Sequence, residues 1–333
     1  MTGTPTTRTR PTWPDLPASV RAAVEVRLGA PVTGWTSHDG GYSQGLASTL
    51  RTADGSVFVK AVGAEHAFTV GLYREEARRA ALLPDGVPAP RFLWSAEIPA
   101  AEIPAAEIPA GAARPDEGWV ALAFETHPSH NPRQPWADDE LRAVLDLAVA
   151  VGEHPVAAGA LPAFETELPT DRTRRLADEA PPGLTTYDPW LAQHLGRLAT
   201  LEEGAPAAVA GSSLVHGDLR GDNALLVDDG PGGVRALAVD WPNAARGAAF
   251  CDLVGMLPAT QVEGGPAPEE ALARRPLPVG TDKDAVTAYL VALTGYFVHS
   301  SLQPPPPGIP HVRAFQRAQG EACVAWLRRR LGP

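Results

Sequence analysis

The feature of the sequence that most constrains the fold is a change in hydrophobic periodicity between residues 125 and 135. Before it, short runs rich in Val, Phe and Thr alternate with glycines, as in β-strands joined by tight turns. After it, apolar residues recur every three or four positions, as in amphipathic helices. We therefore expect an α+β fold with a small β-rich lobe at 1–127 and a larger helical lobe at 128–333.

The first part predicts a strand, a glycine turn, a second strand, a hairpin and a third strand. The turn lies around Gly40, Gly41 and Gly45, and Asp54-Gly55 is a hairpin signal that precedes a strand over 57–62. LYREEARRAALLP then has helical spacing, and RFLW and WVALAFE predict two further strands. Later helices are expected from Asp138 or Asp139, around Tyr187 to Leu201, from Asp284 to His299, and from Val312 to Leu331.

A pentapeptide is written three times between two of these strands, as AEIPAAEIPAAEIPA at 96–110. Proline at every fifth position excludes a regular helix, and three units are too few for a solenoid. We expect this repeat to be an expanded surface loop of the first lobe without a role in function.

Composition narrows the function. Of 333 residues, 44% are hydrophobic and 20% are charged, which is ordinary for a folded chain. The formal net charge of -11 argues against a nucleic-acid or anionic-membrane partner, because both require a concentrated basic face. The same charge favours a cationic small molecule.

The sequence predicts a cytoplasmic protein. Its N-terminus has no apolar segment of the kind that a secretory signal needs, and no stretch reaches the roughly 18 apolar residues that span a bilayer. Cys251 and Cys323 lie far apart without a metal-binding spacing, so we expect two buried thiols in a reducing compartment.

Nine residues, VHGDLRGDN at 215–223, concentrate polar side chains directly after an apolar run. Downstream, ALLV and VRALAV flank the turn-rich DDGPGG, which predicts a β-hairpin. Antiparallel pairing would place Asn223 and Asp240 nearly opposite each other, with Cα atoms roughly 4.5–5.5 Å apart. Mg²⁺ prefers oxygen ligands and usually keeps substrate phosphate among them, so this pair fits a nucleotide-bound metal. The alternative is a polar turn that only caps the hairpin.

The pattern H-G-D-x-x-x-x-N at 216–223, followed by Asp240, resembles the catalytic loop and metal-binding aspartate of the protein-kinase-like fold. Its form is typical of aminoglycoside phosphotransferases and related small-molecule kinases, and the resemblance covers most of the chain. It implies a bilobal fold with a small antiparallel N-terminal lobe. It also implies that Asp218 accepts the proton of the acceptor hydroxyl, and that Asn223 and Asp240 hold Mg²⁺.

Two departures from the protein-kinase form favour a small-molecule acceptor over a protein. Gly217 stands where protein kinases have arginine, and Trp241-Pro242 stand where they have Phe-Gly.

Lys60 is the predicted phosphate clamp. In SVFVKAV the period of two places it on the same face as apolar residues. Lys60 and Lys283 are the only lysines among 28 basic residues, which suggests that a compact charge on a flexible stem is required there. The resemblance implies that this lysine binds the α- and β-phosphates and pairs with a helix glutamate. We expect Glu76 to be the partner, with Glu75 as the alternative, because Glu76 has apolar residues four and seven positions later.

The resemblance also implies how a nucleotide is held. Backbone amides from Gly41 to Gly45 and the Ser43 hydroxyl would cover the phosphates, although GGYSQG does not have the protein-kinase glycine spacing. In the segment FETH, backbone groups of Glu125 to His127 would meet the purine of ATP or GTP.

Four further polar residues lie in or near the predicted loop. His216 is expected to bond backbone within it, and Asp252 resembles a family aspartate that braces it. Arg220 and Asp222 could touch phosphate or acceptor, or could form a solvated turn pair.

These observations predict a Mg²⁺-dependent transferase that moves a phosphoryl group from ATP or GTP to a hydroxyl of a small molecule, such as an aminoglycoside-like antibiotic. Acidic stretches at 202–203 and 263–270 could attract an amine of the acceptor. The alternatives are a metabolic kinase for a choline-like amine, sugar or amino alcohol, and a nucleotide-binding pseudokinase. A two-metal phosphoesterase would need D-x-H and G-N-H elements, which the sequence lacks.

Overall fold

The computed structural model describes residues 10–38, 44–99, 118–230, 233–305 and 311–332. The chain forms two compact units. One comprises Met1–Leu83, Ala89–Pro128 and Asp240–Pro242, and the other comprises Pro84–Pro88, Ser129–Val239 and Asn243–Pro333. The short segment that begins at Asp240 therefore packs with the N-terminal unit, although it lies far along the chain.

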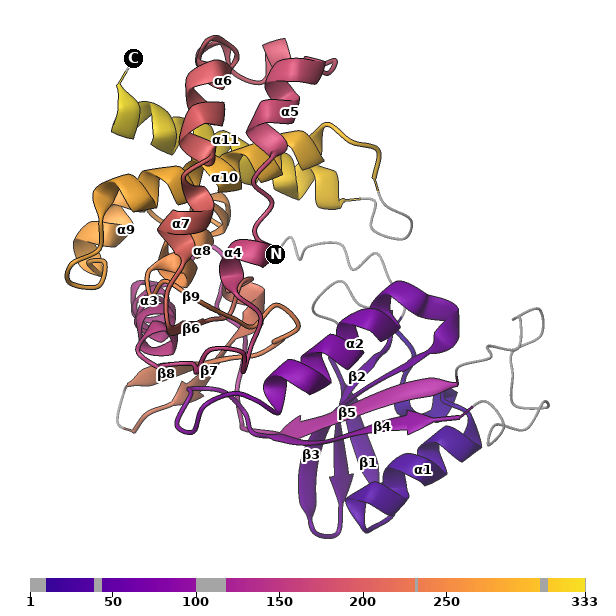
Figure 1. Ribbon diagram of the computed structural model, residues 1–333. Coiled ribbons are helices and arrows are strands. Elements are labelled where there is room, and N and C mark those ends of the chain that lie inside the picture. Colours follow the sequence, from indigo (N-terminus) through magenta and orange to yellow (C-terminus); the bar gives the residue numbers. More distant parts are fainter. Residues whose placement is uncertain (1–9, 39–43, 100–117, 231–232, 306–310, 333) are drawn as a thin grey trace. The chain divides into compact units, whose positions relative to one another are not determined.

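The first unit is a five-stranded antiparallel sheet with the order β1-β2-β3-β5-β4 and a helix on each face (Figure 1). Its elements are α1 (Ala18–Leu28), β1 (Gly34–Ser37), β2 (Leu46–Thr52), β3 (Gly55–Gly63), α2 (Ala67–Ala80), β4 (Phe92–Ile98) and β5 (Trp119–Glu125).

The alternation of side chains along β3 assigns the two faces of this sheet. Val59 and Ala61 lie in one apolar core with Val20 and Val24 of α1. Lys60, between them in sequence, points to the other face, where α2 packs on β3, β4 and β5. The period of two therefore directs the lysine side chain towards α2.

The second unit is mainly helical. Its elements are α3 (Asp138–Gly152), α4 (Phe164–Glu167), α5 (Arg172–Glu179), α6 (Pro189–Glu202), α7 (Ala205–Val209), β6 (Ser213–Val215), β7 (Ala224–Asp228), β8 (Val234–Ala238), β9 (Ala245–Gly247), α8 (Cys251–Val262), α9 (Pro268–Arg274), α10 (Lys283–Ser301) and α11 (Val312–Leu331).

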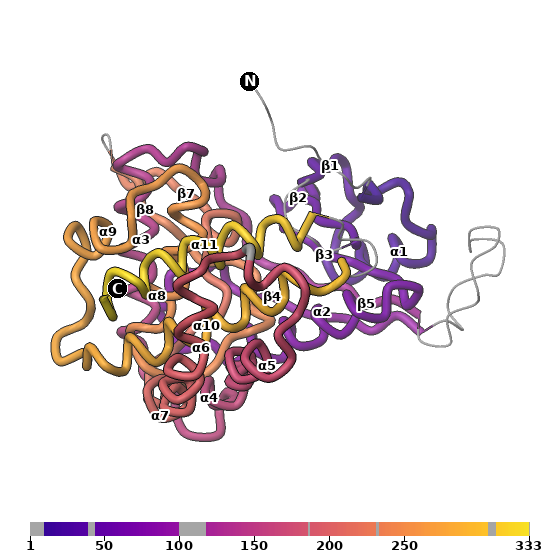
Figure 2. The backbone as a smooth tube through the Cα atoms, turned by 90° about the horizontal axis from the view of Figure 1, so that it is seen from above, coloured from indigo at the N-terminus to yellow at the C-terminus, as the bar shows by residue number. Residues whose placement is uncertain are grey.

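Two long helices and two small sheets organise this unit. Helices α10 and α11 lie side by side (Figure 2). β7 pairs with β8 as the predicted hairpin, and β6 pairs with β9. The segment between β6 and β7 contains the sequence HGDLRGDN. Each end of that loop therefore continues into a strand of a two-stranded antiparallel sheet.

Most predicted elements are present, and α11 has the expected bounds. Helix α1 was not predicted, because its apolar residues Val20 and Val24 follow a proline-rich start. Helix α2 begins at Ala67, earlier than the segment from Leu72 that was expected.

The repeat is only partly a loop. Its first residues belong to β4, where Ala96 and Ile98 are buried on the sheet while Glu97 between them is exposed. The expectation that the whole of 96–110 lies on the surface was therefore wrong for these residues, because alternation in A-E-I fits a strand. The rest of the repeat lies outside the described residues.

The described part of the chain contains no helix that is both long enough and apolar enough to cross a membrane.

Two helical glycines provide a matched test of the packing in the second unit. A Cβ atom on Gly152 of α3 would lie 2.5 Å from the Ala249 carbonyl oxygen, whereas one on Gly196 of α6 would meet nothing within 4 Å. We predict that Gly152→Ala destabilises the protein by roughly 1–3 kcal/mol through overpacking. Gly196→Ala should stabilise it by about 0.5–1 kcal/mol, because alanine has the higher helix propensity. Urea unfolding measures both, and equal effects would contradict this packing of α3.

Candidate active site

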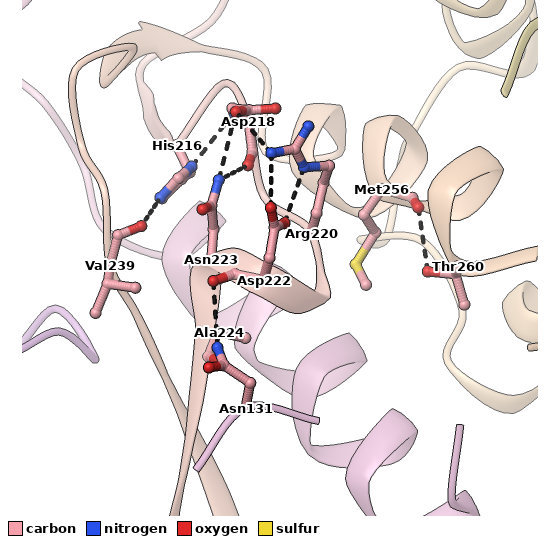
Figure 3. Close-up of polar contacts among 10 residues, drawn as sticks. All are labelled: Asn131, His216, Asp218, Arg220, Asp222, Asn223, Ala224, Val239, Met256 and Thr260. Carbon is pink, nitrogen blue, oxygen red and sulfur yellow. Dashed lines mark hydrogen bonds and ion pairs between the residues drawn. The ribbon is translucent and has the colours of Figure 1, made fainter. Parts of the chain in front are cut away.

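The loop that follows β6 is held by buried polar contacts (Figure 3). His216 is fully buried, and one of its ring nitrogens lies 2.9 Å from the carbonyl oxygen of Val239. The other ring nitrogen lies 3.3 Å from the backbone nitrogen of Asp218. The expectation that His216 bonds the backbone within this region is confirmed.

Asp252, in the first turn of α8, braces the same loop. Its carboxylate accepts hydrogen bonds from the backbone nitrogens of His216 at 2.7 Å and Gly217 at 3.0 Å. Burial raises the pKa of Asp252 to about 6, although both hydrogen bonds favour the ionised form. Two donors aimed at one buried carboxylate fix the start of the loop.

Gly217 is required by the local backbone. It has φ +81°, and a Cβ atom there would lie 2.8 Å from the carbonyl oxygen of Asn243. No side chain fits this position without displacing the neighbouring strand connection. The departure from the arginine of protein kinases therefore has a steric cause.

Asp218 and Asn223 lie together. The Asn223 amide donates to the Asp218 carbonyl oxygen at 2.7 Å, and its nitrogen is 3.4 Å from Oδ2 of the Asp218 carboxylate. The Asp218 side chain is 41% exposed, so it can reach a bound molecule. Asn131, which the sequence analysis missed, donates to the carbonyl oxygens of Asp222 and Ala224 (Figure 3).

The hairpin register continues beyond its last strand residues. Ala224 pairs with Ala238, and the backbone nitrogen of Val239 donates to the Asn223 carbonyl oxygen at 3.0 Å. Asp240 is the next residue in the chain, with a left-handed φ of +66°. Asparagine and aspartate tolerate that conformation better than other side chains, and such outliers concentrate at functional sites.

In the first unit, Lys60 is 8% exposed, and its ammonium lies between two carboxylates. Its Nζ atom is 2.8 Å from both Glu76 oxygens and also contacts Asp240. Glu75, the alternative partner, pairs instead with Arg78 and Arg79.

The protonation of this cluster follows from its charges. Burial alone would lower the pKa of Lys60, but the Asp240 and Glu76 carboxylates outweigh it and raise that pKa, so the ammonium is retained. Burial raises the pKa of Glu76 to about 7, and Asp240 adds to this while Lys60 opposes it. Two carboxylates against one ammonium leave an excess of negative charge. A divalent cation would neutralise it, and the Asp240 side chain is 42% exposed.

Three of the other residues predicted to contact the nucleotide belong to the described part of the chain: Gly45, Glu125 and His127. Gly45 fits closely against the Ala61 carbonyl oxygen of β3, so a side chain there would collide with backbone. Gly41 and Ser43 lie outside the described residues. Glu125 ends β5 and pairs with Arg91 at 2.6 Å, which lowers the pKa of its carboxyl. His127 follows in the connection out of the first unit.

Another carboxyl, that of Glu263, lies against the loop at the end of α8. Glu263 and the Trp136 indole both lie against Gly221, where a Cβ atom would be about 3 Å from each. Burial raises the pKa of Glu263 to about 7, and the charge of Asp222 adds to this while Arg220 opposes it. Glu263 is therefore a carboxyl with a raised pKa beside the loop that contains Asp218.

The raised pKa of Glu263 predicts a pH dependence of stability. Between pH 4.5 and 7 the unfolded chain releases this proton while the folded chain keeps it, so the free energy of unfolding falls as pH rises. Glu263→Gln should remove this component, worth up to about 3 kcal/mol across that window. Urea unfolding at intervals from pH 4.5 to 8 measures it. Glu270→Gln changes an exposed carboxyl and is the control, so its curve should parallel the wild type. A Glu263→Gln curve that also parallels the wild type would contradict the prediction.

Comparison with known proteins identifies the family. The sequence pattern of the phosphotransferase enzyme family matches residues 48–289. No curated protein sequence matches the chain.

Many solved structures are similar in fold. A thermostable mutant of aminoglycoside phosphotransferase APH(4)-Ia, in complex with AMP-PNP and hygromycin B, superposes with a TM-score of 0.57 at 17% identity, over 95% of this chain and 100% of that one. Spectinomycin phosphotransferase APH(9)-Ia, with ADP and spectinomycin, gives 0.52 at 10% identity, over 93% and 97%. Choline kinase LicA from Streptococcus pneumoniae gives 0.53 at 14% identity, over 92% and 98%.

At these identities the structural likeness establishes the fold, and the expectation of a protein-kinase-like α+β fold is confirmed. Because the family pattern matches residues 48–289, which is most of the sequence, the chain belongs to the phosphotransferase enzyme family.

Proposed function

We propose that the protein transfers the terminal phosphoryl group of ATP or GTP to a hydroxyl of a small-molecule antibiotic, and thereby confers resistance to it. Family membership supports the phosphotransfer. The observation that carries the proposal is the buried cluster of Lys60, Glu76 and Asp240, because a buried ammonium held by two carboxylates is built to receive phosphate and metal.

Within this proposal Asp218 is the catalytic residue. Its exposed carboxylate accepts the proton of the acceptor hydroxyl as the new bond to phosphorus forms. Asn223 holds the backbone of Asp218. Its amide oxygen would be available to hold the metal. Catalysis then consists of positioning and charge neutralisation, and needs no covalent intermediate.

The donor is a magnesium nucleotide. Asn223 and Asp240 would hold Mg²⁺, whose oxygen preference matches an amide and a carboxylate. Lys60, oriented by Glu76, would bind the α- and β-phosphates. The metal would supply charge neutralisation on the transferring phosphoryl group.

The rest of the nucleotide would be held by backbone. Gly41, Ser43 and Gly45 would cover the phosphates, and backbone groups from Glu125 to His127 would meet the purine. The reaction would take place in the cytoplasm, where nucleoside triphosphates are available and where the buried thiols of Cys251 and Cys323 stay reduced.

The acceptor is proposed to carry amines. The net charge of -11 favours a cationic molecule, and Glu263 adds a carboxyl beside the loop that contains Asp218. Aminoglycosides have both amines and hydroxyls. A choline-like metabolite has the same two groups, so the acceptor assay includes both classes.

The test is a transfer assay with Mg-ATP or Mg-GTP and a panel that contains hygromycin B, spectinomycin and choline. We predict that one class of acceptor gains about 80 Da, the mass of one phosphoryl group. Asp218→Asn should lower kcat by about 10²–10⁴-fold, because the base is lost while the shape is kept.

Asp229→Asn is the matched control, since Asp229 is an exposed residue of the hairpin turn. Its activity should equal that of the wild type. Absence of any phosphorylated product together with absence of nucleotide binding would refute the proposal. A biological effect that survives Asp218→Asn would indicate a pseudokinase instead.

A further inference from the structure

Arg220 lies two residues after Asp218 and is not a solvated turn residue. Its side chain is only 17% exposed. Its guanidinium binds Asp222 through two parallel hydrogen bonds, from Nε to Oδ1 and from Nη2 to Oδ2, both at 3.0 Å (Figure 3). A bidentate pair of this kind fixes the plane of the guanidinium as well as its position.

A second contact fixes Arg220 from a distant part of the chain. The guanidinium carbon lies 5.7 Å from the ring centroid of Phe315 in α11. Cation–π contacts of this length are attractive when the cation is partly shielded from water. Arg220 is therefore held on one side by its own loop and on another by the C-terminal helix.

The same guanidinium reaches Asp218. Nη2 of Arg220 lies 3.5 Å from Oδ2 of the Asp218 carboxylate, and Nδ2 of Asn223 lies 3.4 Å from that same oxygen. Oδ2 is thus flanked by two nitrogen donors. An exposed aspartate would otherwise sample several side-chain rotamers.

The negative charges around Arg220 explain why a positively charged side chain is needed at this position. Asp218 and Asp222 pair with Arg220, Glu263 interacts with it electrostatically, and the charges of Asp252 and Asp218 repel each other. Without the guanidinium these carboxyls would repel one another, and Asp218 would turn away from its neighbours.

We infer that Arg220 is a positioning residue, clamped by Asp222 and Phe315, that holds the Asp218 carboxylate in the orientation that receives the acceptor hydroxyl. This inference rests on the proposed function, because it assigns a purpose to the orientation of Asp218. It assigns no contact between Arg220 and substrate. The loss expected on breaking the clamp therefore falls on turnover and not on nucleotide affinity.

The experiment compares Arg220→Met, Arg220→Lys, Asp222→Asn and Phe315→Leu with wild type. Displacement of a catalytic group by about 1 Å can cost up to about 100-fold. We expect Arg220→Met and Asp222→Asn each to lower kcat by about 10–100-fold, with the KM for Mg-ATP within about twofold of wild type. Arg220→Lys should restore part of kcat, because it keeps the charge but loses the fork. Phe315→Leu should have a smaller effect of the same kind.

Non-additivity and a matched control separate positioning from folding. The double variant Arg220→Met/Asp222→Asn should be no slower than Arg220→Met alone, because both changes break one unit. Arg235→Gln removes an exposed arginine paired with Asp229 on the hairpin, and should leave kcat and Tm unchanged. Wild-type kcat in Arg220→Met, or losses that follow Tm across all variants, would overturn the inference.

A readout without turnover distinguishes this inference from the proposed function. The Nε–H resonance of Arg220, assigned by its absence in Arg220→Lys, should exchange slowly with water in wild type and at least about tenfold faster in Asp222→Asn, where the charge-assisted bond is weakened. Equal exchange would overturn the clamp even if the enzyme is active. Slow exchange in a wild-type protein that phosphorylates no acceptor would instead refute the proposed function and leave the clamp standing.

Discussion

The structure depends on one buried ammonium. Lys60 projects from the face of β3 that meets α2, and it would be strongly destabilising there without partners. Glu76 and Asp240 supply them, so the position of α2 and the path of the chain after Val239 are both tied to the same strand residue. Removing one member of such a cluster leaves an uncompensated charge, which costs more than the intact cluster contributes. The arrangement is thus a constraint on geometry more than a source of stability.

The loop that contains Asp218 differs from this cluster, because the Asp218 carboxylate is exposed while the backbone of the loop is held in place. Buried groups do the fixing: His216 contacts the Val239 carbonyl oxygen, and Asp252 accepts the backbone nitrogens at the start of the loop. Asp218 then extends from a rigid backbone towards solvent, flanked by Asn223 and Arg220. In a preorganised site, buried groups hold an exposed group in place before a substrate binds. His216 and Asp252 would serve Asp218 in this way.

The sequence predicted the parts that local rules control. The hairpin after Asn223, the bounds of α11 and the choice of Glu76 over Glu75 follow from periodicity and turn residues. Contacts between residues far apart in sequence were not accessible in that way: nothing local indicates that Asn131 bonds the loop or that Phe315 meets Arg220. The segment A-E-I of the repeat was assigned to a loop because its prolines dominated the pattern, whereas its alternation belongs to β4.

The most direct test is a crystal structure of the protein with Mg²⁺ and AMP-PNP. We predict that the metal is bound by the Asp240 carboxylate and the Asn223 amide oxygen. We also predict that Lys60 leaves Asp240 for phosphate oxygens while it keeps its contact with Glu76. A metal held by other residues, or a Lys60 that stays on Asp240 and touches no phosphate, would contradict these predictions.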